Sequence, residues 1–348
     1  MTGPGARTPL AAGRTCVPYA KLTRMRRLLV VLALAQAVAL PVSAQTFEAL
    51  GTRASGMGGA FVAVADDATA VYWNPAGVAL GGSFFSLVLD ANMGKAEAEG
   101  AGPAGQQSSG MISLTTLPLG LSYYRLSSST VTPTSNPQTV QLDRLTTHHA
   151  GVTLVQSLTS RIAVGGTVKW VRGFAASGLV PDGNRDDLLD GAGDLPDLST
   201  NKFDVDAGIM MNLGTFRAGF TARNLAEPDF STPGGGALTL KRQTRAGVSY
   251  VGVTGLIVAA DVDVERQQGS LGDIRDVAAG AEARLFRRGW LRSGFRFNAL
   301  GDEPGGHAPV YSFGGSVMTF RSLLVDAQIT FGAREGDRGW GVAARLVY

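Results

Sequence analysis

The last nine residues, Trp340-Gly-Val-Ala-Ala-Arg-Leu-Val-Tyr348, carry the pattern that decides the fold. Alternate residues from Trp340 to Tyr348 are apolar or small, and an aromatic residue stands at each end of this row. The intervening row contains Arg345. Because successive side chains of a strand point to opposite faces, the stretch predicts one apolar and one polar face. This pattern is typical of a strand in a transmembrane barrel, although an edge strand of a water-soluble sheet alternates in a similar way.

Thirteen segments upstream show the same period of two, which predicts a strand for each. The six clearest segments are residues 162–170, 203–212, 216–223, 256–265, 277–285 and 323–331. The other seven are residues 83–92, 110–117, 119–127, 149–157, 238–250, 291–299 and 310–319. We therefore expect an all-β protein with about 14 antiparallel strands over residues 83–348.

The connections between these segments alternate between short and long. The short ones include Leu117–Leu119 and Phe320–Ser322, and the longer ones fall near residues 93–109, 128–147, 174–200, 226–237, 266–272, 300–308 and 332–338. Outer-membrane barrels combine an even strand count with short periplasmic turns and longer outer loops. Backbone polar groups in lipid must be paired internally, so an all-strand membrane protein has to close on itself. A transmembrane antiparallel β-barrel is thus the predicted fold, and an exported water-soluble β-sandwich or propeller is the alternative.

The first 44 residues have the features of a leader and signal peptide. Basic residues at Met25-Arg-Arg precede an apolar run over residues 28–40, and small residues surround a cleavage position after Ala44. This order is typical of a secretory signal, and the run is too short for a spanning helix. Met25 would itself open a signal of ordinary length. We expect residues 1–44 to be removed on export to the outer membrane.

Composition excludes several classes of protein. The first 44 residues hold six Lys and Arg and no acidic residue, whereas the remainder has 25 basic and 28 acidic residues. The basic character of the whole chain therefore comes from the leader, and we expect no nucleic-acid partner. The single cysteine, Cys16, also lies in the leader, so disulfides and thiolate chemistry are excluded from the rest.

A glycine-rich motif lies between the leader and the first predicted strand. It runs Gly56-Met-Gly-Gly-Ala-Phe61 and continues through Asp66-Asp67 to Tyr72-Trp-Asn-Pro-Ala-Gly77. Asp66 or Asp67 is placed to cap a short helix over residues 68–73. Pro75 disfavours continuation of that helix. The glycines do not form a nucleotide-binding loop, because no Lys-Ser/Thr pair follows them.

This motif resembles the N-terminal signature of FadL-like and PorV-like outer-membrane β-barrels. Later segments, including Phe203–Ile209 and Arg245–Tyr250, are similar to the PorV/PorQ and TraF-like branch. The resemblance implies that residues 45–82 fold inside the barrel as a hatch, with Asn74, Pro75 and Ala76 matching the family's Asn-Pro-Ala tripeptide. A helix stop with no function beyond plugging is the alternative for Asn74 and Pro75.

Charged residues recur on the polar rows of the predicted strands, which would face the barrel lumen. They are Lys169, Asp204, Asp206, Arg217, Arg223, Asp261, Asp263, Glu282, Arg284, Arg292, Arg296, Asp326 and Arg345. Both signs occur on neighbouring strands. They would form either a polar conduit or a network of ion pairs that fills the barrel and retains the hatch. Unpaired burial is costly, so each charge is expected to have a partner.

Other candidate sites have weaker patterns. Asp182-Gly-Asn-Arg-Asp186-Asp187 spaces its oxygen ligands like a calcium loop, but the sixth and twelfth positions do not fit, so we favour a solvated acidic loop over residues 181–197. His148 and His149 are adjacent and should point to opposite faces. No nucleophile elbow or cofactor motif is present. We expect neither a metal site, nor a cofactor, nor catalysis.

The sequence thus leads to two functional hypotheses. The first is passive transport of hydrophobic or amphipathic small molecules through a hatch-plugged lumen. The second is a surface scaffold or protein-secretion accessory, PorV-like, that binds a secreted protein through its outer loops. In either case we expect a monomer that contacts outer-membrane lipid and lipopolysaccharide. The resemblance to outer-membrane barrels also implies that Tyr348, as a terminal aromatic residue, is recognised by the outer-membrane assembly machinery.

Overall fold

A computed structural model describes residues 50–80, 84–97, 101–269, 272–300, 309–332 and 337–348. The predicted signal peptide over residues 1–44, with its cleavage position, lies outside the described residues. No helix among the described residues is long and apolar enough to span a bilayer.

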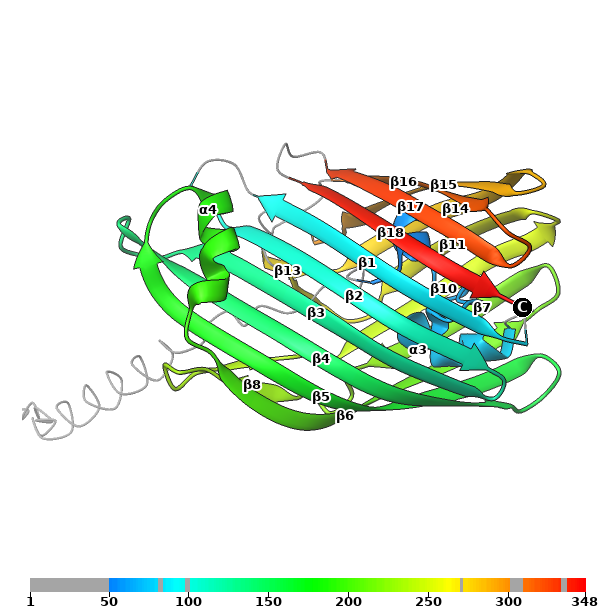
Figure 1. Cartoon of the computed structure of the whole chain (residues 1–348), viewed down its shortest axis with the longest axis horizontal. Helices are drawn as coiled ribbons and strands as arrows, with labels where there is room; N and C mark the ends of the chain where they lie inside the picture. Colours follow the sequence, from blue (N-terminus) through cyan, green and yellow to red (C-terminus); the bar gives the residue numbers. More distant parts are fainter. Residues whose placement is uncertain (1–49, 81–83, 98–100, 270–271, 301–308, 333–336) are drawn as a thin grey trace, which may run out of the picture. The chain divides into compact units, whose positions relative to one another are not determined.

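Fourteen antiparallel strands close into a barrel, and this confirms the predicted fold (Figure 1). The strands are β1 (Ser86–Glu97), β2 (Ala104–Thr116), β3 (Leu119–Pro133), β4 (Thr139–Ser157), β5 (Ile162–Pro181), β6 (Leu198–Asn212), β7 (Phe216–Arg223), β10 (Gln243–Val253), β11 (Leu256–Asp263), β14 (Asp276–Phe286), β15 (Gly289–Asn298), β16 (Val310–Met318), β17 (Leu323–Gly332) and β18 (Arg338–Val347). β18 pairs with β1, with Leu346 opposite Leu87, and this pairing closes the ring.

The last strand has the two faces that its sequence predicts. Trp340, Val342 and Leu346 are exposed on the outside of the barrel, whereas Gly341, Ala343 and Arg345 are buried inside it. Tyr348 is 82 % exposed. Large apolar side chains are exposed on the outward faces of most strands, as a lipid-facing surface requires.

Six strands, β1 to β6, extend beyond their predicted segments, and the ends of β1 and β2 occupy most of the loop expected over residues 93–109. β3, β4 and β5 extend well beyond the apolar segments, so most of the expected loop over residues 128–147 is strand. The extension pairs polar residues across strands, for example Ser127 with Thr146, whose hydroxyl oxygens are 2.8 Å apart. Alternation of apolar and polar residues fades in this region, so the sequence pattern does not mark it.

The long connections also contain structure of their own. The β5–β6 connection contains α4 (Arg185–Asp190) and the 3₁₀ helix η3 (Gly191–Asp194). The β7–β10 and β11–β14 connections form two small hairpins, β8 (Asp229–Ser231) with β9 (Ala237–Thr239) and β12 (Gln267–Gly269) with β13 (Gly272–Ile274). The predicted strand over residues 238–250 is therefore wrong at its start, because residues 237–239 belong to a hairpin. We call this end of the barrel the long-loop end and the other the short-turn end.

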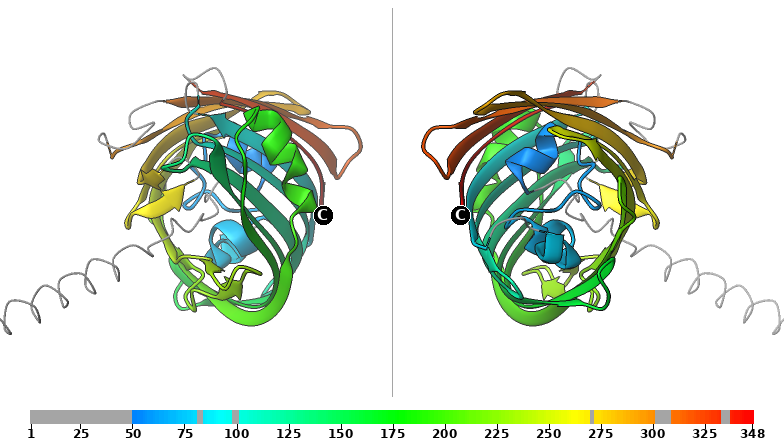
Figure 2. Two further views of the ribbon diagram at one scale, coloured as in Figure 1. Left: turned by 90° about the vertical axis from the view of Figure 1, so that its left-hand side faces the viewer. Right: turned by 90° about the vertical axis from the view of Figure 1, so that its right-hand side faces the viewer.

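The N-terminal segment lies inside the barrel. It comprises α2 (Thr52–Gly56), α3 (Ala70–Trp73) and the 3₁₀ helix η2 (Pro75–Leu80), and the end-on views show these helices within the ring of strands (Figure 2). We call residues 50–80 the hatch. α3 begins two residues later than predicted, because residues 67–69 form a turn in which the Asp67 side chain accepts from Thr69 N and the Asp67 carbonyl from Ala70 N, both at 2.9 Å. Asn74 is extended, and the helix stops there, as Pro75 predicts.

The hatch backbone rests directly on glycines of the barrel wall. A Cβ at Gly165 would lie 2.5 Å from Ala76 N, and one at Gly280 would lie 2.1 Å from Met57 O. Other inward glycines in close contact with the hatch are Gly120, Gly208, Gly219, Gly294 and Gly314. Three cross-strand pairs, Gly165–Gly208, Gly219–Gly247 and Gly280–Gly294, place many of these residues side by side. The high glycine content therefore lets two backbones approach closely.

Candidate functional site

Arg53 of α2 lies at the centre of the contact between hatch and barrel. Its Nε and Nη2 atoms donate to the two carboxylate oxygens of Glu282 in β14, at 2.9 and 2.8 Å. Its Nη1 atom donates to Asp66 at 2.5 Å and to Asp67 at 3.0 Å. The guanidinium fork is suited to such bidentate pairing with a carboxylate. One buried side chain thus connects two parts of the hatch to the wall.

The ion pairs continue along the wall from this arginine. Glu282 also accepts from Arg292, and Arg292 reaches Asp326 at 3.1 Å. Arg345 of β18 pairs with Asp326 and lies 3.3 Å from Asp67. We call this set the Arg53 network; its members are Arg53, Arg292, Arg345, Asp66, Asp67, Glu282 and Asp326. Its four carboxylates and three guanidiniums alternate, so no charge in it is buried without a partner.

Two barrel carboxylates bind the hatch backbone. Asp90 of β1 accepts from Gly51 N at 3.1 Å and from Thr52 N at 2.7 Å, at the start of α2. Asp261 of β11 accepts from Phe61 N and Val62 N, both at 2.8 Å. The first N–H groups of a helix have no acceptor within the helix, and N–H groups of a loop often have none nearby. The carboxylates of Asp90 and Asp261 are the acceptors for these N–H groups of the hatch.

The Asn-Pro-Ala tripeptide fixes the end of the hatch. Asn74 Nδ2 donates to Val62 O at 3.0 Å and to Ile209 O of β6 at 3.1 Å. Its Oδ1 atom accepts from Ala76 N at 3.2 Å. Asn74 is fully buried and therefore joins two hatch segments to the wall with one amide. Pro75 and Ala76 lie against Gly165.

A second charge cluster is buried in the wall nearer the long-loop end. Lys169 Nζ lies 2.9 Å from Asp204, 2.7 Å from Asp206 and 3.1 Å from Asn224 Oδ1. All four side chains are almost completely buried. Asn224 has a positive φ of 54°, and its N–H donates to Asp206 at 2.9 Å. The cluster fixes the bend at which β7 ends.

Two further arginines contact the hatch. The Arg223 guanidinium lies 3.4 Å from the centre of the Tyr72 ring, a geometry that favours cation–π attraction. Arg245 of β10 pairs with Asp263 at 2.6 Å and reaches Gly59 O at 3.4 Å. These two arginines lie on the neighbouring strands β7 and β10 and contact different parts of the hatch.

The remaining predicted lumen charges lie at its margins. Arg217 is 3.8 Å from Asp66, and Arg296 is 3.8 Å from Asp276. Arg284 is not in the lumen interior: it is exposed at the end of β14, with its guanidinium 5.4 Å from the Trp290 ring centre. Arg284 belongs to the row of alternate residues that faces inward along the rest of β14. It lies two residues before the end of the strand at Phe286, and there its side chain is exposed.

Sequence reasoning missed Arg53, Asp90 and Arg245 as site residues. Asp90 and Arg245 follow the inward parity of their strands, so the alternation rule could have found them. Arg53 is the only charged residue of the short helix α2, and the period-two alternation that marks strands does not indicate it.

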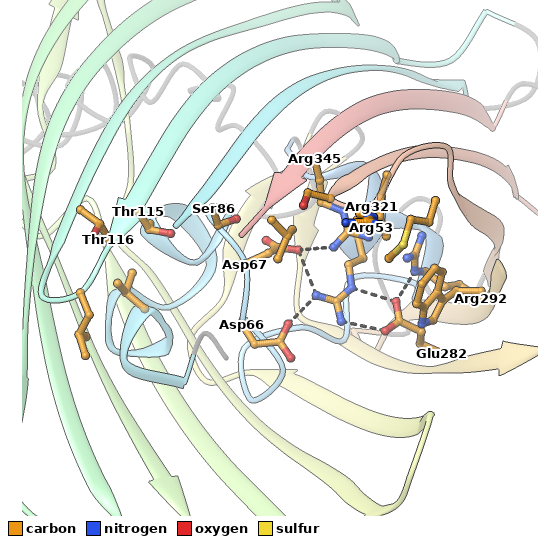
Figure 3. Close-up of a pocket in the computed structure, with 17 residues that line it drawn as sticks. Arg53, Asp66, Asp67, Ser86, Thr115, Thr116, Glu282, Arg292, Arg321 and Arg345 are labelled. Atoms are coloured by element: carbon orange, nitrogen blue, oxygen red, sulfur yellow. Dashed lines mark hydrogen bonds and ion pairs between the residues drawn. The ribbon is translucent and has the colours of Figure 1, made fainter. Parts of the chain in front are cut away.

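A cavity of about 330 Å³ opens at the short-turn end beside the Arg53 network. Figure 3 shows Arg53, Asp66, Asp67 and Glu282 directed toward one another at its wall. Apolar side chains complete the lining; they are Val78, Leu117, Trp290, Met318, Leu324 and Val347. Arg321 stands at the rim and is exposed.

The acidic segment at the long-loop end folds as a capped helix. Asn184 caps α4 by accepting from Asp186 N and Asp187 N, and Arg185 Nη1 pairs with Asp182 at 2.5 Å. Lys95 of β1 donates to Asp186 at 2.7 Å, and this hydrogen bond lowers the pKa of the Asp186 carboxyl. No group of three potential metal ligands gathers anywhere in the described ranges.

The histidine pair points to opposite faces, as predicted. His149 is buried and stacks on Tyr124, with ring centres 4.4 Å apart. His148 lies on the outer face, and its Nδ1 atom is 2.7 Å from Tyr123 Oη.

The fold and the site together define a closed transmembrane β-barrel with its N-terminal segment folded inside the lumen. A protein family described as "F plasmid transfer operon, TraF, protein" matches residues 119–263. No curated protein matches the chain.

Solved structures that share this fold include one described as a transporter and one described as a channel. The toluene transporter TodX of Pseudomonas putida is similar over 87 % of this chain and 99 % of its own, at 13 % identity and a TM-score of 0.62. The CymD monoaromatic hydrocarbon channel is similar over 86 % and 97 %, at 14 % identity and 0.57. A FadL homologue of Pseudomonas aeruginosa is similar over 88 % and 99 %, at 10 % identity and 0.57. At these identities the comparisons establish the fold that the chain shares with FadL-type channels.

Proposed function

We propose that this protein is an outer-membrane channel for the passive transport of hydrophobic or amphipathic small molecules, and that the hatch is its gate. The observation that carries the proposal is a barrel of the hydrocarbon-channel fold whose lumen contains an ordered N-terminal hatch. Export would require the signal peptide over residues 1–44. The short-turn end would face the periplasm, as in other barrels with this loop asymmetry.

A buried apolar cluster inside the barrel is compatible with this class of cargo. It lies between the hatch and the long-loop end, where the β8–β9 hairpin packs against β4 and β5; its members are Leu145, Val171, Ala175, Phe230, Leu238 and Leu240. Gly173 makes room for the Phe230 ring, because a Cβ there would lie 2.1 Å from it. These side chains are at most 5 % exposed, so a hydrophobic molecule would leave water against them only after the β8–β9 hairpin had moved from the wall.

Passage toward the periplasm would then require movement of the hatch. The hatch core is buried and its backbone touches the wall glycines, so a ligand could not pass between hatch and wall at these glycines unless the hatch moved. The cavity below would receive the cargo once the Arg53 network opened. No step of this mechanism forms or breaks a covalent bond.

Uptake by liposomes tests the proposal. Vesicles containing the barrel should accumulate an apolar probe such as toluene or a fluorescent alkyl amphiphile faster than empty vesicles. Removal of residues 45–82 should increase that rate. Equal rates with and without the barrel would contradict the channel function.

A secretion accessory of the PorV type is the second candidate. The tight retention of the hatch favours it, because a scaffold has no need of a conducting lumen. The match to the TraF family over residues 119–263 is compatible with it. Co-purification of a secreted protein with the barrel, together with no uptake of apolar probes, would support this alternative.

A further inference from the structure

Two arginines and the histidine between them cross the outer face of the barrel, and neither arginine has a carboxylate partner among the described residues. Arg125 of β3 stands directly opposite His148 of β4, which stands opposite Arg172 of β5. By strand alternation all three side chains point outward, away from the buried residues Tyr124, His149 and Val171. Among the described residues no ion pair is made by Arg125 or Arg172, in contrast to the arginines of the Arg53 network.

This row marks the edge of the apolar band. The next row of outward-pointing residues toward the short-turn end lies two residues along each strand from β2 to β6. Its members are Ile112, Tyr123, Ala150, Trp170 and Phe203. The next outward-pointing row toward the long-loop end consists of Ser108, Ser127, Thr146, Phe174 and Ser199. The first set is mostly large, apolar and exposed, and the second is mostly hydroxylic. Arg125 and Arg172 thus lie where lipid tails end and headgroups begin.

Aromatic rings hold the row in place. The Arg172 guanidinium lies 5.0 Å from the centre of the Phe174 ring, and His148 meets the same ring edge-on at 5.8 Å. Tyr123 fixes the other side of His148 through the 2.7 Å contact to Nδ1. A guanidinium already ordered on a ring loses little freedom when it binds a second group.

We propose that Arg125, His148 and Arg172 form a binding site for a phosphate of lipopolysaccharide in the outer leaflet. The site requires an anion at headgroup depth beside acyl chains, and the phosphates of the lipid A anchor have that chemistry. Arginine binds phosphate oxygens in bidentate fashion. The apolar row below would contact the acyl chains. The inference rests on the proposed outer-membrane orientation, with the long loops outside, but does not depend on transport.

Binding of lipid A to the purified, folded barrel in detergent tests the proposal. We expect bisphosphorylated lipid A to bind, and the double variant Arg125→Gln/Arg172→Gln to bind it at least tenfold more weakly. The matched control is Arg161→Gln/Arg288→Gln, which removes two exposed arginines from the short-turn end and should bind like the unaltered protein. Heat-modifiable migration on gels would establish that each variant is folded.

A second ligand separates phosphate recognition from general lipid adhesion. Dephosphorylated lipid A should bind the unaltered barrel as weakly as bisphosphorylated lipid A binds the double variant. Equal affinity for both ligands, or equal affinity of both barrels for lipid A, would overturn the site. Because binding is measured without uptake, a failed uptake assay would contradict the channel function and leave this result intact.

Discussion

Arg53 and Glu282 are 229 residues apart in the sequence, yet their side chains form a two-point ion pair inside the barrel, with N–O distances of 2.8 and 2.9 Å. This pair joins the hatch to β14. Its burial matters as much as its geometry, because two ions removed from water are stable only while both are paired. The hatch is therefore retained by charges whose loss should release it.

Glu282→Gln should loosen the hatch and leave the barrel closed. The substitution keeps the shape of the side chain but leaves Arg53 and Arg292 with one carboxylate fewer, and breaking a buried pair costs about 3–5 kcal/mol. Hydrogen–deuterium exchange of peptides from residues 50–80 should accelerate, while exchange in β14 changes little. Glu265→Gln is the control, since its pair with Arg242 is exposed at both partners. Unchanged hatch protection in Glu282→Gln would show that the pair does not retain the hatch.

Adjacent glycines of β5 provide a matched test of backbone contact. Gly165→Ala would place its Cβ 2.5 Å from the hatch backbone at Ala76, whereas the Cβ of Gly166→Ala would have no atom closer than 3.7 Å. We expect the first variant to displace η2 and raise the proteolytic sensitivity of the hatch. The second should resemble the unaltered protein. If both variants resist protease equally, the glycine contacts are not what positions the hatch.

Asn74→Asp should weaken the end of the hatch although it changes one atom. The carboxylate can still accept from Ala76 N, but it cannot donate to Val62 O or Ile209 O. Each buried carbonyl left without a donor costs about 1–3 kcal/mol. Exchange of the amides around Asn74 should rise several-fold. The exposed residue Asn136, replaced in the same way, should leave hatch exchange unaltered.

Alternation predicted the strands because it is a local property of the sequence, and Trp340–Tyr348 shows it within nine residues. The partners of each inward charge are not local. They depend on strand register and on closure between β18 and β1, which bring Arg345 near Asp67 across 278 residues. Arg53 shows what alternation cannot predict, because a single arginine in a five-residue helix forms no repeating pattern. Arg284 illustrates the opposite error: it has the inward parity, but its strand ends before the side chain is enclosed.

The attachment of α4 to the barrel should depend on pH. Lys95 lowers the pKa of Asp186, so the ionised carboxylate is favoured in the folded state. This contribution to stability is present above the ordinary carboxyl pKa and is lost as pH falls through the lowered value. The protection of amides in residues 185–194, measured relative to their intrinsic exchange rate at each pH, should therefore fall as the pH is lowered below the ordinary carboxyl range. Asp186→Asn should show the low protection already at neutral pH; a pH response of the same size in that variant would contradict the assignment to Asp186.

The central claim, that the hatch gates a transport route, is tested most directly by fixing the hatch to the wall. Thr52 in α2 and Asn92 in β1 lie side by side, with Oγ1 and Oδ1 3.4 Å apart. The only native cysteine is Cys16, so the cysteines of Thr52→Cys/Asn92→Cys in the chain without its leader can be bridged directly as a disulfide by adding a mild oxidant as the reagent. We predict that uptake of an apolar probe into liposomes falls to the level of empty vesicles on bridging, while each single variant treated with the reagent transports normally. Uptake that persists at its full rate in the bridged barrel would contradict the account.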